Sequence, residues 1–133
     1  MSDTAGYQWV SFFFQYCFAA AATSIISGAV AGRITITAYF VYSGVVVTCI
    51  YPVVVHWVWD NEGWLCAWGS RATYGGVIDF AGSGVVHMTG GFCAITAATI
   101  LGPRKGRFTH PELFAAHSAP LQVLGTILLW VGW

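Results

Sequence analysis

The stretch DFAGSGVVHMTGG, residues 79–91, places a carboxylate and an imidazole in an otherwise apolar part of the chain. Asp79 and His87 lie eight residues apart. Four glycines accompany them: Gly82, Gly84, Gly90 and Gly91. A carboxylate in an apolar segment can bind a cation or move a proton. A neutral imidazole offers one donor and one acceptor, which suits the passage of a small hydrogen-bonding solute or a proton relay.

Each of these residues also has a structural explanation. Asp79, near a helix N-terminus, would cap free N–H groups and complement the helix dipole, and this role does not exclude a functional one. His87 could make an interhelical hydrogen bond. The glycines fit both close helix packing and a narrow passage, and the sequence alone does not separate the two.

The composition predicts that the elements positioning these residues are membrane helices. Of 133 residues, 57% are hydrophobic and only 8% are charged, whereas soluble domains carry about 25% charged residues. Four runs lack Asp, Glu, Lys and Arg: residues 4–32, 34–59, 80–103 and 113–133. The first three reach the roughly 20 residues that a spanning helix needs. We expect no nucleic-acid partner, because the net charge is zero and no basic patch suggests one.

We therefore predict an all-α, polytopic membrane protein with helices over residues 7–31, 35–59, 78–101 and 116–133. Lys and Arg favour the cytoplasmic side, which places Arg33 and the basic loop 104–107 inside and Arg71 outside. The loop 60–77 then faces outward, and Asp79 lies just below the outer surface. On a continuous helix His87 would lie about 12 Å deeper, and Tyr51 would lie a similar distance below Trp59.

Aromatic side chains in the spans allow a second kind of chemistry. Phe18 and Trp59 could hold a small ammonium-like ion by cation–π contact, although a place in the interfacial aromatic belt is the simpler explanation for either ring. Phe14 lies on the same helical face as Phe18. Gly28 and Gly32 have the spacing of a helix-packing face. The four cysteines lack metal or redox spacings, so we expect no metal and no cofactor.

Several segments together resemble the ammonium transporter (Amt/Mep/Rh) superfamily, and most closely its eukaryotic AMT-type members. DFAGSGVVHMTGG resembles the family signature, and FQYCFAAAATSIISGAVAGR resembles its third spanning helix. YPVVVHWVWDNEGW, GPRKGRF and HSAPLQVLGTILLWVGW resemble the end of the fourth helix, the following inner loop and the sixth helix. The resemblance covers residues 1–133 as a partial transporter domain, the third to sixth of about eleven helices.

The resemblance implies inverted halves around one pore per subunit, and assembly as a homotrimer or heterotrimer. It implies a recruitment site at Phe18, Trp59 and Asp79, a gate at Phe14, and pore-lining roles for Tyr51 and His87, the first of two pore histidines. The second histidine, the second gate aromatic and a recruitment-site serine would follow Trp133. The family usually has an acid where this chain has Gly32, which puts an ion pair with Arg33 in doubt.

The implied function is transport of ammonium or ammonia, with methylammonium as an analogue, by a multi-pass protein of the lipid bilayer, in the plasma membrane. The protein would not be an enzyme and would have no catalytic residues. One alternative stays open at this point. A family-derived membrane protein could keep these helices for assembly or ammonium sensing without transporting.

Overall fold

The computed structural model describes residues 3–132, and the side chains of residues 6–132. These residues are mostly helical and form no β-strand, although an isolated bridge joins Cys66 and Val77. Four stretches are long and apolar enough to cross a membrane: Gly6–Val30, Ile36–Trp59, Ser83–Leu101 and Pro111–Gly132. The predicted fold class, an all-α polytopic membrane protein, is confirmed.

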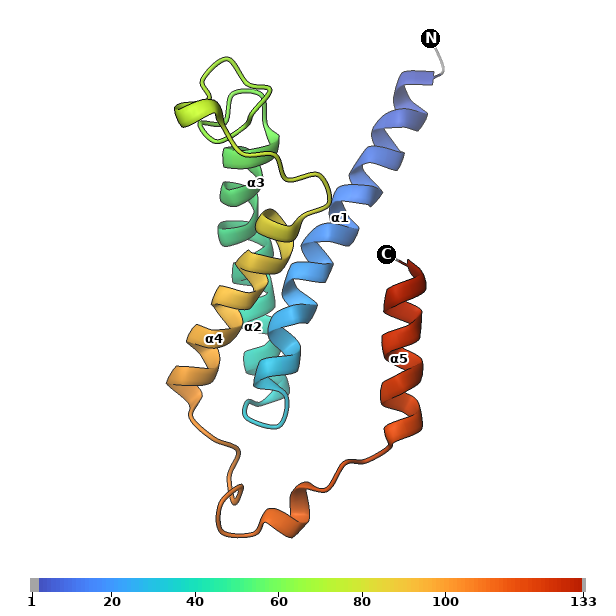
Figure 1. Cartoon of the computed structure of the whole chain (residues 1–133), viewed down its shortest axis with the longest axis vertical. Helices are drawn as coiled ribbons and strands as arrows, with labels where there is room; N and C mark the ends of the chain where they lie inside the picture. Colours follow the sequence, from blue (N-terminus) through green and yellow to red (C-terminus); the bar gives the residue numbers. More distant parts are fainter. Residues whose placement is uncertain (1–2, 133) are drawn as a thin grey trace. The chain divides into compact units, whose positions relative to one another are not determined.

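The first two spans lie close to the predicted ranges 7–31 and 35–59. The helix α1 covers Asp3–Val30. The second span is one rod of three successive segments: α2 (Ile36–Val45), the π-helical turn η1 (Val46–Ile50) and α3 (Tyr51–Trp59) (Figure 1).

Local sequence explains how this second rod begins and why it changes its winding. The Thr35 hydroxyl accepts a hydrogen bond from the Ala38 amide at 3.3 Å and so caps the first turn. Pro52 has no amide hydrogen, and its ring would collide with the carbonyl four residues earlier in a regular helix. The wider turn η1 directly precedes Tyr51 and lets the rod continue through this proline.

The third span begins later than predicted. Residues 60–82 form a loop with one short 3₁₀ turn, η2 (Thr73–Gly75), and helix starts with the π-helical turn η3 (Ser83–Met88). It continues as α4 (Thr89–Leu101). The prediction of helix from residue 78 is therefore wrong by five residues. Gly82 has a left-handed φ of 85°, which turns the chain immediately before the helix.

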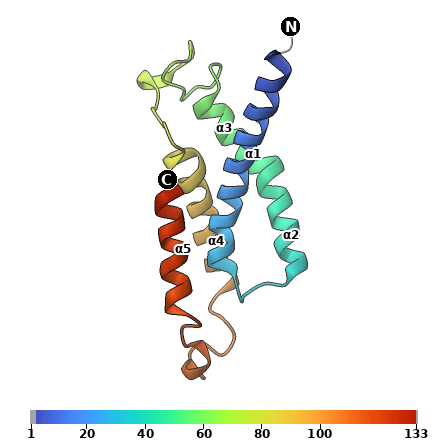
Figure 2. The ribbon, with the colours of Figure 1, turned by 90° about the vertical axis from the view of Figure 1, so that its right-hand side faces the viewer.

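Helix α4 packs against the second half of α1, and the two lie side by side in both views of the ribbon (Figures 1 and 2). Gly90 makes this contact possible, because a Cβ atom there would lie 2.8 Å from the Ala22 carbonyl oxygen. Gly28, which the sequence indicated as a packing residue, has no such neighbour within 4 Å. Gly32 lies in a turn with φ 71°. Small residues do bring two helices together here. The residues in contact are Gly90 and Ala22, however, and not the predicted Gly28 and Gly32.

Arg33 joins the ends of two spans. Its Nη1 donates a hydrogen bond to the Gly102 carbonyl at 2.7 Å and a longer one to the Ala98 carbonyl at 3.5 Å. A cation at a helix C-terminus satisfies free carbonyls and complements the dipole. Arg33 thus contacts backbone oxygens at the end of α4, and the left-handed conformation of Gly32 is one that glycine adopts readily.

Residues from Pro103 onward form a separate unit. It contains the 3₁₀ turn η4 (Pro111–Phe114) and the helix α5 (Ala119–Gly132). The Ser118 hydroxyl accepts a hydrogen bond from the Leu121 amide at 3.3 Å and caps α5. The predicted fourth helix, 116–133, therefore begins three residues later than expected, and its final residue, Trp133, lies outside the described residues.

Candidate functional site

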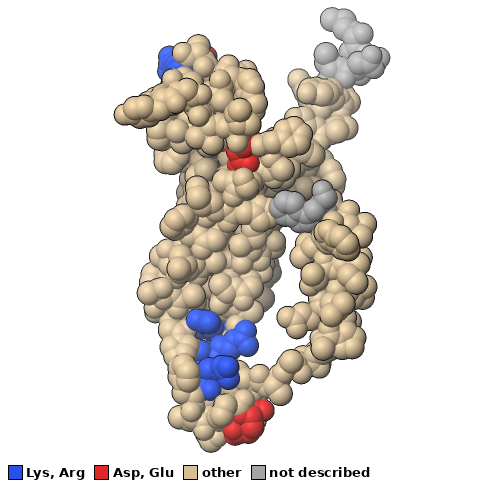
Figure 3. All heavy atoms as spheres, viewed as in Figure 1, with Lys and Arg blue, Asp and Glu red and all other residues tan. Residues whose placement is uncertain are grey.

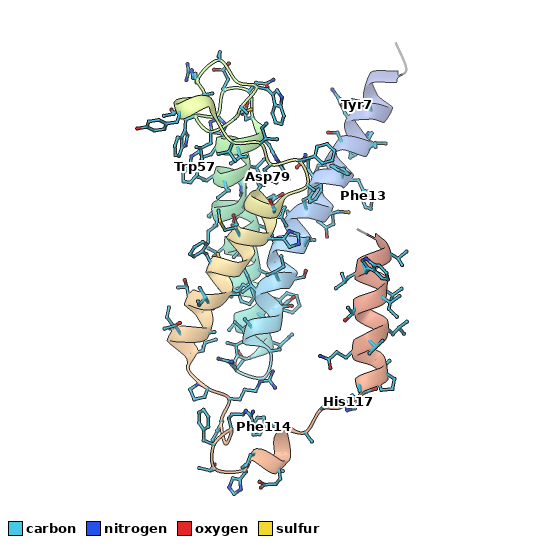
Figure 4. The ribbon with its side chains drawn as sticks, in the orientation of Figure 1. Tyr7, Phe13, Trp57, Asp79, Phe114 and His117 are labelled. Carbon is cyan, nitrogen blue, oxygen red and sulfur yellow. The ribbon has the colours of Figure 1, made fainter. Side chains whose placement is uncertain are left out.

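Asp79 lies ahead of the third span and closes its N-terminus with both carboxylate oxygens. Oδ1 accepts hydrogen bonds from the amides of Gly82 and Ser83 at 2.8 and 2.9 Å. Oδ2 accepts from the amides of Gly84 and Val85 at 2.9 and 2.7 Å. The side chain is only 5% exposed, and Figure 4 shows it at the start of this helix. The capping role predicted for Asp79 is confirmed.

This set of donors keeps the carboxylate charged. Burial would raise the pKa of Asp79, but the backbone amides of Val85, Gly82, Gly84 and Ser83 outweigh that effect and hold the pKa below its usual value. The Ser83 hydroxyl adds a longer hydrogen bond to Oδ1 at 3.4 Å. None of these donors is a cation, so the carboxylate keeps its negative charge. The negative potential of this carboxylate is therefore not cancelled by a cation among its hydrogen-bond donors.

Trp59, the last residue of α3, is oriented by the main chain of Asp79. Its indole Nε1 donates a hydrogen bond to the Asp79 main-chain carbonyl at 2.7 Å. The far edge of the ring, at Cη2, lies 3.4 Å from where a Cβ of Gly82 would be. The same residue thus caps one helix with its side chain and orients the final side chain of another with its backbone.

Three aromatic rings then follow one another from α3 to α1. The centroids of Trp59 and Phe18 are 5.5 Å apart with an interplanar angle of 68°. Those of Phe18 and Phe14 are 4.8 Å apart at 81°. Both are edge-to-face pairs, the geometry that aromatic quadrupoles favour. The structure thus brings together Phe18, Trp59 and Asp79, three residues that are 20 to 61 positions apart in the sequence.

Tyr51 is packed in the core beside this site. It is 4% exposed and shares an apolar cluster with Ala22, Val58 and Val85. Its hydroxyl is buried and has no hydrogen-bond partner among the residues that the structure describes. Since a buried hydroxyl without a partner costs about 1–3 kcal/mol, this group is suited to bind a polar solute.

His87 lies in the π-helical turn that opens the third span. It belongs to η3, and its Nδ1 is 3.1 Å from the Gly82 carbonyl oxygen. The predicted separation of about 12 Å assumed helix from residue 79. Helix instead starts at Ser83, so this assumption is wrong, and the depth of His87 stays a prediction.

Sequence reasoning missed two parts of this arrangement. The left-handed turn at Gly82 has one sequence signal, the glycine itself, because glycine adopts a positive φ readily. The bond from the Trp59 indole to the Asp79 carbonyl has no sequence signal, because it joins a side chain to a backbone oxygen across a loop of 19 residues.

The fold and these contacts define a class: a multi-pass α-helical membrane protein in which an acid that caps the third span lies beside aromatic rings from the end of the second span and the middle of the first. The chain matches the model of the Ammonium Transporter Family over residues 1–133, and it belongs to that family.

Similar curated proteins come from plants. The chain is 49% identical over 134 residues to "Ammonium transporter 1 member 2" of Oryza sativa subsp. japonica and 48% identical over 131 residues to "Ammonium transporter 1 member 1" of Solanum lycopersicum. In both comparisons 96% of this chain is covered, but only 27% of the relative. The chain thus spans about a quarter of the length of these relatives. No solved structure matched it.

Proposed function

We propose that this chain supplies the cation-recruitment site and one wall of the pore of an ammonium transporter. The observation that carries the proposal is the meeting of Phe18, Trp59 and Asp79 where the second span ends and the third begins. Cation–π contact with the two rings, in the negative potential of a buried carboxylate, would favour a small monovalent cation over neutral solutes. The names of the relatives support ammonium as that cation.

Passage beyond this site requires loss of a proton. An ammonium ion without hydration or a counter-charge would be very costly in an apolar pore, whereas ammonia needs only hydrogen bonds. The resemblance assigns the gate to Phe14, which lies one turn nearer the N-terminus of α1 than Phe18 and therefore on its outer side in the predicted orientation. Tyr51 and His87 would supply hydrogen-bonding groups deeper in the pore. The proton then moves separately or returns to the outside.

The proposal extends to the assembly and location of the complete protein. Ammonium or ammonia would be its substrate and methylammonium an analogue, and subunits would assemble as a homotrimer or heterotrimer in the plasma membrane. No metal and no cofactor take part in this mechanism, and no covalent bond to the substrate is formed. The protein acts as a transporter rather than an enzyme.

A chimera tests the transport role directly. The matching segment of the Solanum lycopersicum relative is replaced by this chain, and methylammonium uptake with potassium competition is measured in yeast that lacks its own ammonium uptake. The chimera should take up methylammonium, and His87→Ala should lower uptake about tenfold, the loss expected when one buried hydrogen bond is removed. The exposed His110→Ala is the matched control and should leave uptake unchanged.

Two results would contradict the proposal. A correctly inserted chimera without uptake would favour the alternative role in assembly or sensing. If His87→Ala leaves the rate of methylammonium uptake and the rejection of potassium unchanged, His87 has no role in the pore. The recruitment site is tested separately, by substitutions of its own residues.

A further inference from the structure

The segment that follows α4 displays three cations on a compact turn. Residues 103–110, here called the basic turn, are closed by two backbone hydrogen bonds, from the Arg107 amide to the Arg104 carbonyl at 3.0 Å and from the His110 amide to the Gly106 carbonyl at 2.9 Å. Gly106 has a left-handed φ of 83° and reverses the chain between them. The turn exposes Arg104, Lys105 and Arg107 (Figure 3).

None of these three cations is neutralised within the part of the chain that the structure describes. Arg71, on the opposite loop, forms an ion pair with Glu62 at 3.3 Å. Glu112, the acid closest to the basic turn in the sequence, pairs with His110 at 3.3 Å and with none of the three cations. Arg107 rests over the ring of Phe114, with 5.5 Å from Cζ to the ring centroid. This contact orients the guanidinium and leaves its charge uncompensated.

The basic turn lies between two spans and therefore near a membrane surface. The preceding span ends at Leu101, and the next spanning stretch starts at Pro111. So few residues between two spans must stay within the headgroup layer of one leaflet. Apolar side chains accompany the cations, since Phe108 is 83% exposed and Leu113 is 76% exposed. Exposed cations beside exposed apolar groups suit the boundary between headgroups and acyl chains.

We infer that the basic turn binds the headgroups of anionic phospholipids in the leaflet that it contacts. Arg104 and Arg107 can each hold a phosphate oxygen pair with a planar guanidinium, and Lys105 adds a point charge. A lipid fits these observations better than an acidic protein, because the turn is confined to the headgroup layer and carries apolar side chains. The inference is independent of the proposed transport.

Lipid selectivity can be measured on this chain as it stands. The 133-residue chain is reconstituted into phosphatidylcholine bilayers that contain a small amount of spin-labelled phosphatidylserine or spin-labelled phosphatidylcholine. Electron paramagnetic resonance then gives the relative association constant of the two lipids. The wild type should prefer phosphatidylserine several-fold at low salt, and about 0.5 M salt should remove most of this preference.

Substitutions assign the selectivity to the basic turn. Lys105→Gln should lower the preference by up to about fivefold; its side chain makes no hydrogen bond, ion pair or ring contact within the described residues, so folding is not affected. The triple change to glutamine at Arg104, Lys105 and Arg107 should bring the relative association constant close to one. Arg107→Lys keeps the charge and should retain most of the preference.

Arg71→Gln is the matched control, a cation removed from the other loop, and should leave the selectivity unchanged. The inference is overturned if the wild type binds both lipids equally, if the triple variant keeps the wild-type preference, or if Arg71→Gln lowers it as much as Lys105→Gln does.

Discussion

Replacing Asp79 by asparagine tests how strongly the capped carboxylate stabilises the fold. The carboxylate accepts four backbone N–H groups, two on each oxygen, in a site that is 5% exposed. Asparagine keeps one oxygen and directs an amide NH₂ group at the other pair of donors. Two buried N–H groups then lose their acceptor, at about 1–3 kcal/mol each. We therefore expect a loss of about 2–6 kcal/mol in the free energy of unfolding.

The assay is unfolding in mixtures of mild detergent and dodecyl sulfate, followed by far-ultraviolet circular dichroism. Asp60→Asn is the matched control, because Asp60 is an exposed acid at a helix end that accepts a single backbone amide, that of Glu62 at 3.1 Å. Asp60 also pairs with the exposed His56 at 2.7 Å, so a loss is expected there too, but a smaller one than in Asp79→Asn, because both groups are exposed. The reasoning would be refuted if Asp79→Asn were no more destabilising than Asp60→Asn.

Three further predictions concern the same elements. Gly82→Ala should lower the free energy of unfolding by about 1–3 kcal/mol, because φ is 85° and the new Cβ would lie 2.7 Å from Val86 Cγ2. An unchanged free energy of unfolding would contradict this. Arg33→Gln should speed hydrogen exchange in the last turn of α4, since the bond to the Gly102 carbonyl is lost; equal rates would show that the bond contributes nothing. Acid should also destabilise the protein. Asp60 and Asp79 have lowered pKa values in the folded state, so the stability that they add is complete above the ordinary carboxyl value near pH 4 and is lost as the pH falls through the lowered values. Asp79→Asn should show a smaller loss on acidification than the wild type, and an equal loss would contradict the assignment.

The spans could be predicted because they depend on composition. A run without charges that is about 20 residues long has few alternatives to a membrane helix, and the structure has helix in all four regions. The capping role of Asp79 was also predictable, since short acids at helix starts satisfy free amides. Both inferences use residues that are close together in the sequence.

Features that depend on contacts between distant segments could not be predicted. The sequence offered Gly28 and Gly32 as a packing pair by their spacing, but helix contact is made at Gly90, whose partner is the backbone of Ala22. Spacing identifies a face of one helix and does not identify what lies against it. The start of the third span was misplaced for a related reason, because Ile78 and Phe80 are apolar and yet lie in an extended loop with exposed side chains.

The central claim, that Trp59 and Phe18 form a cation site supported by Asp79, is tested most directly by the concentration dependence of methylammonium uptake in the chimera. Trp59→Leu removes the ring and should raise KM about two- to thirtyfold, the range that a cation–π contact of about 0.5–2 kcal/mol implies. Trp57→Leu removes a neighbouring tryptophan that packs against Trp64 instead, and should leave KM unchanged. An unchanged KM in Trp59→Leu, or an equal rise in both variants, would contradict the recruitment site.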